Sequence, residues 1–213
     1  MGKPRRSATV RLTHWISAIG ILALIVSGTA ILFAHPRLYW GETGAVGTPA
    51  LIDLPIPFML GHSGWGRYLH FLAAWLCLAS GLIYLVHALA SGHLRRDLVP
   101  ARAELKLDEV RRAVSGHLPG NDADRPSLHS YNVVQRVSYL TVVFVLGPLA
   151  LLTGLAFSPA LASVAPVIVN MFGGQQSART IHFFVAAAIV LFVLVHLVLV
   201  CTSGFRARMR GMI

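Results

Sequence analysis

The sequence predicts an all-α integral membrane protein: a four-helix bundle in one domain, residues 1–213, with both termini cytoplasmic. Three observations predict this fold class, namely an apolar composition, four uncharged runs long enough to cross a bilayer, and basic residues gathered on one side of those runs. The chain is 55% hydrophobic and 12% charged, with a mean hydropathy of +0.67. Soluble domains carry about twice that share of charged residues.

Each expected helix is an apolar run of about 20 residues, the length that crosses the hydrocarbon core of a bilayer. The runs are Trp15–Phe33, Leu69–Leu89, Val137–Phe157 and Ile181–Cys201. The first run exceeds the roughly 7–15 apolar residues of a secretory signal, so we expect a retained helix. The apolar run Leu161–Phe172 is too short to span and is expected at the membrane interface. Strand-like alternation is absent.

The basic residues predict the topology. Fifteen of the 18 Lys and Arg residues lie before the first run, after the fourth, or in the second connection and the adjoining start of the third helix. Only Arg37, Arg67 and Arg179 lie on the other side. Because basic residues near helix ends stay cytoplasmic, both termini are expected there. The net charge of +10 is thus a topology signal, and the expected surroundings are membrane lipid, with no nucleic-acid partner.

Histidines in and beside these runs predict the function, because ionisable side chains inside a membrane are costly. His182 and His196 are 14 residues apart on the fourth helix, so their rings point to nearly the same face, about 21 Å apart along the axis. The expected depths of the histidines in the membrane then pair His70 with His182 near the outer surface and His14 with His196 near the cytoplasmic surface. Two bis-histidine pairs suit two haem groups that carry electrons.

His87, near the cytoplasmic end of the second helix, is an alternative to His14 as a ligand. It follows His70 by 17 residues, which turns it about 100° away from the His70 face. That phase favours His14, and the choice between the two histidines stays open at this point.

Three of the four predicted ligands follow an arginine at the spacing R-x-x-H. The pairs are Arg11 with His14, Arg67 with His70, and Arg179 with His182. Residues three apart share a helix face, and an arginine nearer the surface can bind a haem propionate bidentately. The alternative is that arginines simply mark helix ends. Glycines in the helices suit a flat macrocycle and close helix packing equally. They are Gly20, Gly28, Gly81, Gly147 and Gly154.

Together these motifs resemble the bacterial di-haem cytochrome b family, which includes cytochrome b(561) proteins and the b-type subunits of nickel–iron hydrogenases, formate dehydrogenases and thiosulfate reductases. The resemblance covers nearly the whole chain. It rests on R-L-T-H-W at residues 11–15, His70, Y-N-V-V-Q-R at residues 131–136, and R-T-I-H at residues 179–182 with His196. It implies a multi-pass protein of the bacterial inner membrane with two haem b groups and the same ligand pairing.

The resemblance also implies a quinone site on the cytoplasmic side, with quinone as a diffusible substrate. Asn132 and Gln135 match polar positions of the family at the start of the third helix, where they either bind a quinone carbonyl or cap and hydrate the helix. The implied partner is a periplasmic redox protein of the hydrogenase or molybdopterin type. The Y-N-x-x-Q opening is most similar to the thiosulfate-reductase branch.

The predicted function is electron transfer between this partner and the quinone pool through the two haems. No motif for hydride transfer, nucleophilic catalysis or nucleotide binding is present, so we expect no catalytic residue and interpret the chain as an electron-transfer subunit. One alternative is a stand-alone superoxide:quinone oxidoreductase of the same fold, in which Arg67 and Arg179 attract the anion. Another is a transporter with a histidine proton relay, which predicts no haem.

Overall fold

The structure is a computed structural model and describes residues 7–42, 44, 47–55, 64–92, 133–156, 158–202 and 205–212. Three long helices are continuous, α1 (Ala8–Ala34), α2 (Gly64–Ala90) and α8 (Gln175–Thr202). A fourth is composite, and consists of α4 (Val133–Thr141), the π-helical segment η4 (Val142–Leu146) and α5 (Gly147–Ala156). All four are long and apolar enough to cross a membrane, which confirms the predicted four-helix membrane fold.

The helices begin earlier than the apolar runs that predict them. Helix α1 begins at Ala8 rather than at Trp15, and α8 begins at Gln175 rather than at Ile181. Hydropathy detects only the part of a helix that lies in hydrocarbon, whereas backbone hydrogen bonding continues through the polar residues beside it. Ser7 caps α1, because its Oγ accepts a hydrogen bond from the Val10 N–H.

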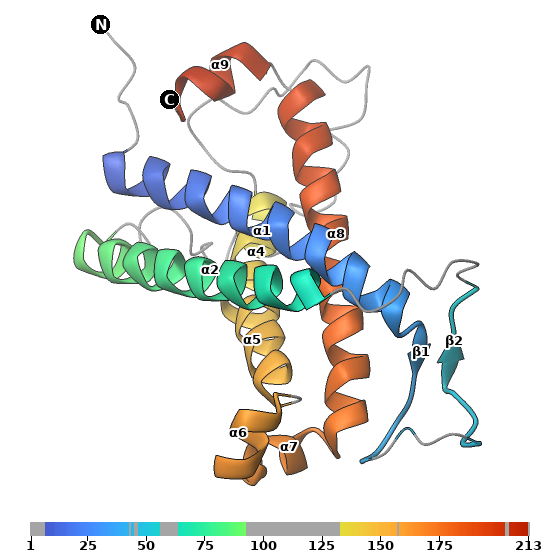
Figure 1. The fold of residues 1–213 in the computed structure, drawn as a ribbon. Coiled ribbons are helices and arrows are strands. Elements are labelled where there is room, and N and C mark those ends of the chain that lie inside the picture. Colours follow the sequence, from blue (N-terminus) through green and yellow to red (C-terminus); the bar gives the residue numbers. More distant parts are fainter. Residues whose placement is uncertain are drawn as a thin grey trace, which may run out of the picture.

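The four helices form two hairpins, one of α1 with α2 and one of the composite helix with α8 (Figure 1). In that view the hairpins cross, since α1 and α2 run side by side across the page while α5 and α8 run along it. Among the described elements, backbone packing is most extensive within the hairpins. The faces that the hairpins turn toward each other are therefore joined mainly by side chains.

Small residues line the contact between α1 and α2 at intervals of about seven residues. The buried positions are Thr13, Gly20 and Ser27 on α1, and Gly66, Ala73, Ser80 and Ala88 on α2. A Cβ added at Gly20 would collide with the Cys77 Sγ, so the helices approach closely there. Ser80 donates its hydroxyl hydrogen across the contact to the Thr13 carbonyl, at 2.9 Å. Small side chains and interhelical hydrogen bonds are how helices associate in lipid.

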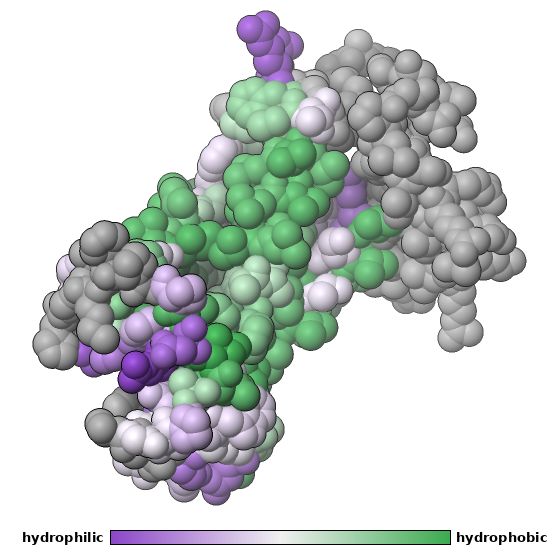
Figure 2. Space-filling model, turned by 90° about the vertical axis from the view of Figure 1, so that its right-hand side faces the viewer, coloured by the Kyte–Doolittle hydropathy of each residue, from purple (hydrophilic) through white to green (hydrophobic). Residues whose placement is uncertain are grey.

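Large apolar side chains point away from these contacts. Ile19 is 68% exposed and Leu22 is 63% exposed on α1. Figure 2 shows hydrophobic residues over the middle of one face of the molecule, with hydrophilic residues toward its ends. This arrangement suits a bilayer, where apolar side chains face lipid tails and the backbone polar groups are satisfied inside each helix.

The composite helix changes its winding just before Pro148. A proline inside a helix removes one N–H donor and clashes with the preceding turn. The π-helical segment η4 ends directly before Gly147, whose N–H bonds to the carbonyl of Val142. A Cβ at Gly147 would lie 3.2 Å from that same oxygen, so glycine suits the wider turn. A π-turn of this kind accommodates the proline without ending the helix.

Short elements fill the connections at the predicted outer side. Strands β1 (Arg37–Leu38) and β2 (Ile52–Asp53) pair antiparallel, a ladder that the sequence does not predict but that leaves the all-α class unchanged. Helices α6 (Pro159–Val164) and α7 (Pro166–Met171) cover most of the short apolar run expected at the interface. Each begins with proline, which suits the first turn of a helix.

The loop after β1 holds the start of α8. The N–H groups of Gln176 and Ser177 donate to the Gly41 carbonyl at 3.0 and 3.2 Å, and the Gly41 N–H donates back to the Ser177 Oγ at 2.7 Å. Thr180 donates to the Tyr39 carbonyl at 2.6 Å. The bonds from Gln176 and Ser177 satisfy donors that the first turn of a helix leaves free, and together the four bonds fix the position of the outer end of α8.

The first and last described segments of the chain meet at the opposite side of the bundle. The Trp15 indole N–H donates to the Met212 carbonyl at 2.9 Å, which brings the segment after α9 (Phe205–Arg210) beside the start of α1. That this side is cytoplasmic stays a prediction from the basic residues.

Candidate functional site

The four predicted ligands lie in two pairs, each formed between the hairpins. His70 on α2 faces His182 on α8, with ring centroids 6.2 Å apart and an interplanar angle of 63°. His14 on α1 faces His196 on α8, with ring centroids 6.4 Å apart and an angle of 65°. After their predicted sides of the membrane, we call His70–His182 the outer pair and His14–His196 the inner pair.

These separations fit one iron ion between the rings of each pair. An imidazole nitrogen lies about 2 Å from a metal it binds, and its ring centre roughly 1.2 Å further, so two axial imidazoles have centres about 6.4 Å apart. Among the described residues, no group of three or more His, Cys, Asp and Glu could hold a metal. A donor set of two imidazoles is the set that a bis-histidine haem requires from a protein.

Each ring of the outer pair contacts a hydroxyl group from the preceding helix of its own hairpin. His70 Nδ1 lies 3.0 Å from the Ser27 Oγ, and His182 Nδ1 lies 3.0 Å from the Thr153 Oγ1. Sequence reasoning missed both hydroxyls. Serine and threonine are common in membrane helices, and no local spacing links them to histidines 43 and 29 residues further along the chain.

Glycines follow both hydroxyl residues and lie against the same rings. A Cβ at Gly28 would lie 3.4 Å from the His70 Cε1, and a Cβ at Gly154 would lie 3.3 Å from the His182 Cε1. These two of the candidate glycines therefore make room at the outer pair, whereas Gly20 serves the packing of α1 on α2.

Aromatic side chains surround the inner pair. The Phe192 ring stacks on His196 with centroids 5.9 Å apart, and Tyr139 on α4 meets His196 edge-on at 6.3 Å. Trp15 meets His14 edge-on at 5.8 Å. Such rings pack apolar area against an imidazole, and they leave His14 itself exposed. Tyr139 and Phe192 are absent from the sequence prediction because aromatic residues in apolar helices carry no specific signal.

His87 has a partner elsewhere. Its Nε2 lies 3.0 Å from the Ser7 Oγ, at the residue that caps α1. The structure thus places His14 beside His196 and gives His87 a contact at the start of α1.

The three arginines of the R-x-x-H motifs have different surroundings. Arg179 donates to the His35 carbonyl at the end of α1. Arg67 is exposed in the first turn of α2, and Arg11 is half-buried near the start of α1. Their binding of haem propionates stays a prediction.

One of the two predicted quinone ligands lies in the described part of the chain. Gln135 is on α4, one helical turn before Tyr139, so the two side chains share a face of the helix. Because Tyr139 contacts His196, that face is turned toward the inner pair. Asn132 lies outside the described residues, and the quinone contact of both stays a prediction.

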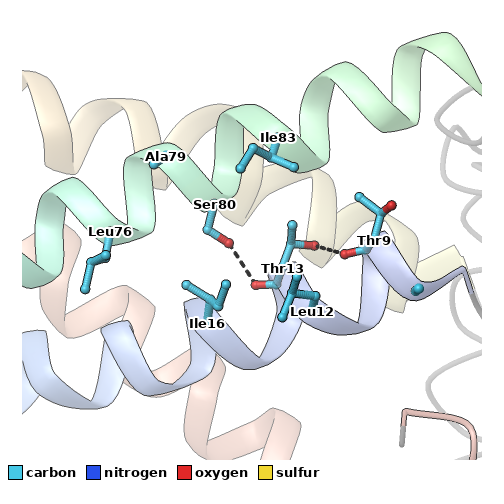
Figure 3. Close-up of a pocket in the computed structure, with 9 residues that line it drawn as sticks. Thr9, Leu12, Thr13, Ile16, Leu76, Ala79, Ser80 and Ile83 are labelled. Carbon is cyan, nitrogen blue, oxygen red and sulfur yellow. Dashed lines mark hydrogen bonds between the residues drawn. The ribbon is translucent and has the colours of Figure 1, made fainter.

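A pocket of about 510 Å³ lies between α1 and α2 (Figure 3). Its lining includes Leu12 and Ile16 on α1 and Leu76 and Ile83 on α2. His14 is two residues from both Leu12 and Ile16, which turns its ring about 200° away from each. The pocket therefore opens on the face of the hairpin opposite the histidine pairs.

The chain matches the family described as prokaryotic cytochrome b561 over residues 5–213. A protein of Azospira oryzae named as a protein-methionine-sulfoxide reductase subunit, YedZ1, is 31% identical over 196 residues, which are 90% of this chain and 87% of the relative. The cytochrome named YdhU of Escherichia coli is 29% identical over 202 residues, which are 93% of this chain and 67% of the relative. A protein of Cupriavidus necator named as a Ni/Fe-hydrogenase B-type cytochrome subunit is 29% identical over 199 residues, which are 89% of this chain and 75% of the relative. No solved structure matches the chain.

Proposed function

We propose, on the premise that the chain belongs to the prokaryotic cytochrome b561 family, that it passes electrons between a redox partner outside the membrane and the quinone pool through two b-type haems. Family membership confirms the resemblance drawn from the sequence and implies haem b. The four helices and the family make it a multi-pass electron-transfer protein of the bacterial inner membrane. The observation that carries the proposal of two haems is the presence of two separate histidine pairs.

A bound haem supplies an iron that changes charge by one electron. The chain would hold each haem with the neutral imidazoles of two histidines, a donor set that suits an electron-carrying iron rather than one that binds a substrate. His70 and His182 would hold the outer haem, and His14 and His196 the inner one. This donor set suits electron transfer, so substrate chemistry would belong to a partner.

On the inner side we place quinone exchange beside His14 and His196. Gln135 can donate a hydrogen bond from its amide to a quinone carbonyl, and it lies one turn from the ring that contacts His196. On the outer side the partner would dock on the connections that carry β1, β2, α6 and α7. Relatives named as subunits of a reductase and of a hydrogenase support a redox partner of that kind.

The wild-type chain, purified in detergent, is expected to hold two haem b groups and to be reduced by a quinol. A haemochrome assay gives the count, and the absorbance of reduced b-type haem after addition of a menaquinol or ubiquinol analogue gives the rate. Gln135→Ala should keep both haems and slow the reduction about tenfold, the loss of one good hydrogen bond. Gln176→Ala, the same chemical change at the outer end, should leave the rate unchanged. A wild type without haem, or with haem that no quinol reduces, contradicts the proposal.

His87→Ala is expected to keep both haems, whereas His14→Ala should lose the inner one. The reason is that His14 faces His196 across the hairpins, while the His87 ring contacts Ser7. The haem content of the two purified variants, each compared with the wild type, decides between them. Loss of a haem in His87→Ala with full content in His14→Ala would reverse the assignment.

A further inference from the structure

The outer histidine pair is held by the same local arrangement twice, once in each hairpin. From this we propose that Ser27 and Thr153 are positioning residues, whose hydroxyls fix the Nδ1–H tautomer and the ring orientation of His70 and His182 and thereby lower the reduction potential of the outer haem. The inference rests on the proposed two-haem function, and it concerns how the chain tunes one of the two centres.

In the first hairpin, Ser27 connects its own helix to the ring of His70. Its hydroxyl donates to the Ala23 carbonyl at 2.6 Å, so its oxygen is left to accept from the His70 Nδ1–H, at 3.0 Å. With Nδ1 carrying the proton, Nε2 keeps its lone pair and is the nitrogen that could bind a metal.

The second hairpin repeats this arrangement with Thr153. Its hydroxyl donates to the Leu149 carbonyl at 2.6 Å and lies 3.0 Å from the His182 Nδ1. The Ala150 carbonyl lies 3.0 Å from the same nitrogen. A carbonyl oxygen only accepts, so Nδ1 carries the proton here too, and Nε2 is the nitrogen whose lone pair can bind a metal.

The match extends to the neighbouring residues. A glycine follows each hydroxyl residue, at Gly28 and Gly154, and a Cβ at either would lie 3.3–3.4 Å from the ring of its histidine. An arginine precedes each histidine by three residues. Because the connections within the two hairpins differ in length, the hydroxyl and its histidine are 43 residues apart in one and 29 in the other. The two hairpins therefore share the geometry around the histidine together with its hydroxyl, glycine and arginine neighbours, but not the spacing along the chain.

Because the two hydroxyls are buried, their hydrogen bonds can affect the basicity and orientation of the histidines. Ser27 and Thr153 are both 0% exposed, so water does not compete for their hydrogen bonds. A partner that accepts the second N–H of a ligating histidine makes the ligand more basic and holds its ring in place. A more basic ligand stabilises ferric over ferrous iron, so removal of the acceptor should raise the reduction potential.

The test is a redox titration of purified Ser27→Ala and Thr153→Val, with the outer haem identified as the one that His182→Ala lacks. Loss of such a partner changes metal affinity by about tenfold. A tenfold change in the ferric-to-ferrous affinity ratio is about 59 mV for one electron. We expect the outer potential to rise by up to that amount in each single variant and further in the double variant, with a changed low-spin EPR signal and an unchanged inner potential.

Thr29→Ala is the matched control. Its hydroxyl makes the same type of bond, to the Ile25 carbonyl at 2.8 Å, but it is exposed and lies two residues from Ser27 on the other side of α1. Ser27→Thr and Thr153→Ser keep the hydroxyl and should retain the wild-type potential. If the alanine and valine variants lose the outer haem altogether while these conservative variants keep it, the positioning role stands.

Two outcomes overturn the inference. One is an outer potential and EPR signal in Ser27→Ala and Thr153→Val that differ from wild type no more than those of Thr29→Ala. The other is loss of the haem in both the conservative and the hydroxyl-free variants, which would make side-chain size decisive. A wild type without haem would contradict the proposed function itself, so the haem content of the wild type is measured first.

Discussion

His182→Ala is expected to remove the outer haem and leave the inner one, and His196→Ala to do the reverse. Both rings are on α8, but 14 residues of helix separate them by about 21 Å, so neither can substitute for the other. Each variant should fall from two haems to one per chain by the haemochrome assay. The haem that remains should differ between the variants in redox potential, because Phe192 and Tyr139 lie against His196 whereas Thr153 bonds to His182.

The double variant His182→Ala/His196→Ala should be free of haem, and His87→Ala is the matched single histidine change that should retain two. Gel filtration in detergent and helical circular dichroism verify that each variant is folded. The pairing is wrong if a folded single variant keeps both haems, or if His182→Ala and His196→Ala leave the same spectral species behind.

Gly20→Leu should separate α1 from α2 and reduce the occupancy of both haems. A Cβ at Gly20 already collides with the Cys77 Sγ, so there is no room for the three further carbons of leucine. Overpacking of this kind typically costs about 1–3 kcal/mol. Because α1 carries His14 and α2 carries His70, a shift between these helices displaces one histidine of each pair. Haem content and the thermal unfolding temperature in detergent measure the effect.

Gly81→Leu is the control, because it makes the same change on α2 where a Cβ would meet no atom within 4 Å. The milder Gly20→Ala should lower the unfolding temperature, and Cys77→Ala in the same chain should restore it by removing the sulfur that the new methyl meets. Equal effects of Gly20→Leu and Gly81→Leu, or no rescue by Cys77→Ala, would show that the small-residue contact does not hold the hairpin together.

The sequence alone predicts the helices and the pairing of the histidines, because both follow from the length of apolar runs and from residue spacing along a single helix. An apolar run such as Ile181–Cys201 marks a span by its length, and the interval between His182 and His196 places two rings on one face at two depths. The helical phase of the alternative ligand His87 argues against it, and in the structure its ring contacts Ser7.

Other features depend on which residues meet across helices, and a single sequence does not contain that information. Ser27 and Thr153 have no signal that separates them from Thr29, which bonds back to its own helix in a similar way. The π-turn before Pro148 and the two-residue ladder of β1 and β2 are equally local adjustments. A proline predicts only that a helix is disturbed, and two paired residues are too few for an alternating pattern.

The placement of both rings on α8 has an electrical consequence. An axial separation of about 21 Å is some two thirds of a hydrocarbon core about 30 Å thick. An elementary charge that crosses the whole membrane gains about 2.3 kcal/mol per 100 mV. An electron that moves from the level of His182 to the level of His196 would therefore exchange up to about 1.5 kcal/mol with the membrane potential for each 100 mV. Transfer through this chain would be voltage-dependent, and the resting potential would set how the electron divides between the two ends.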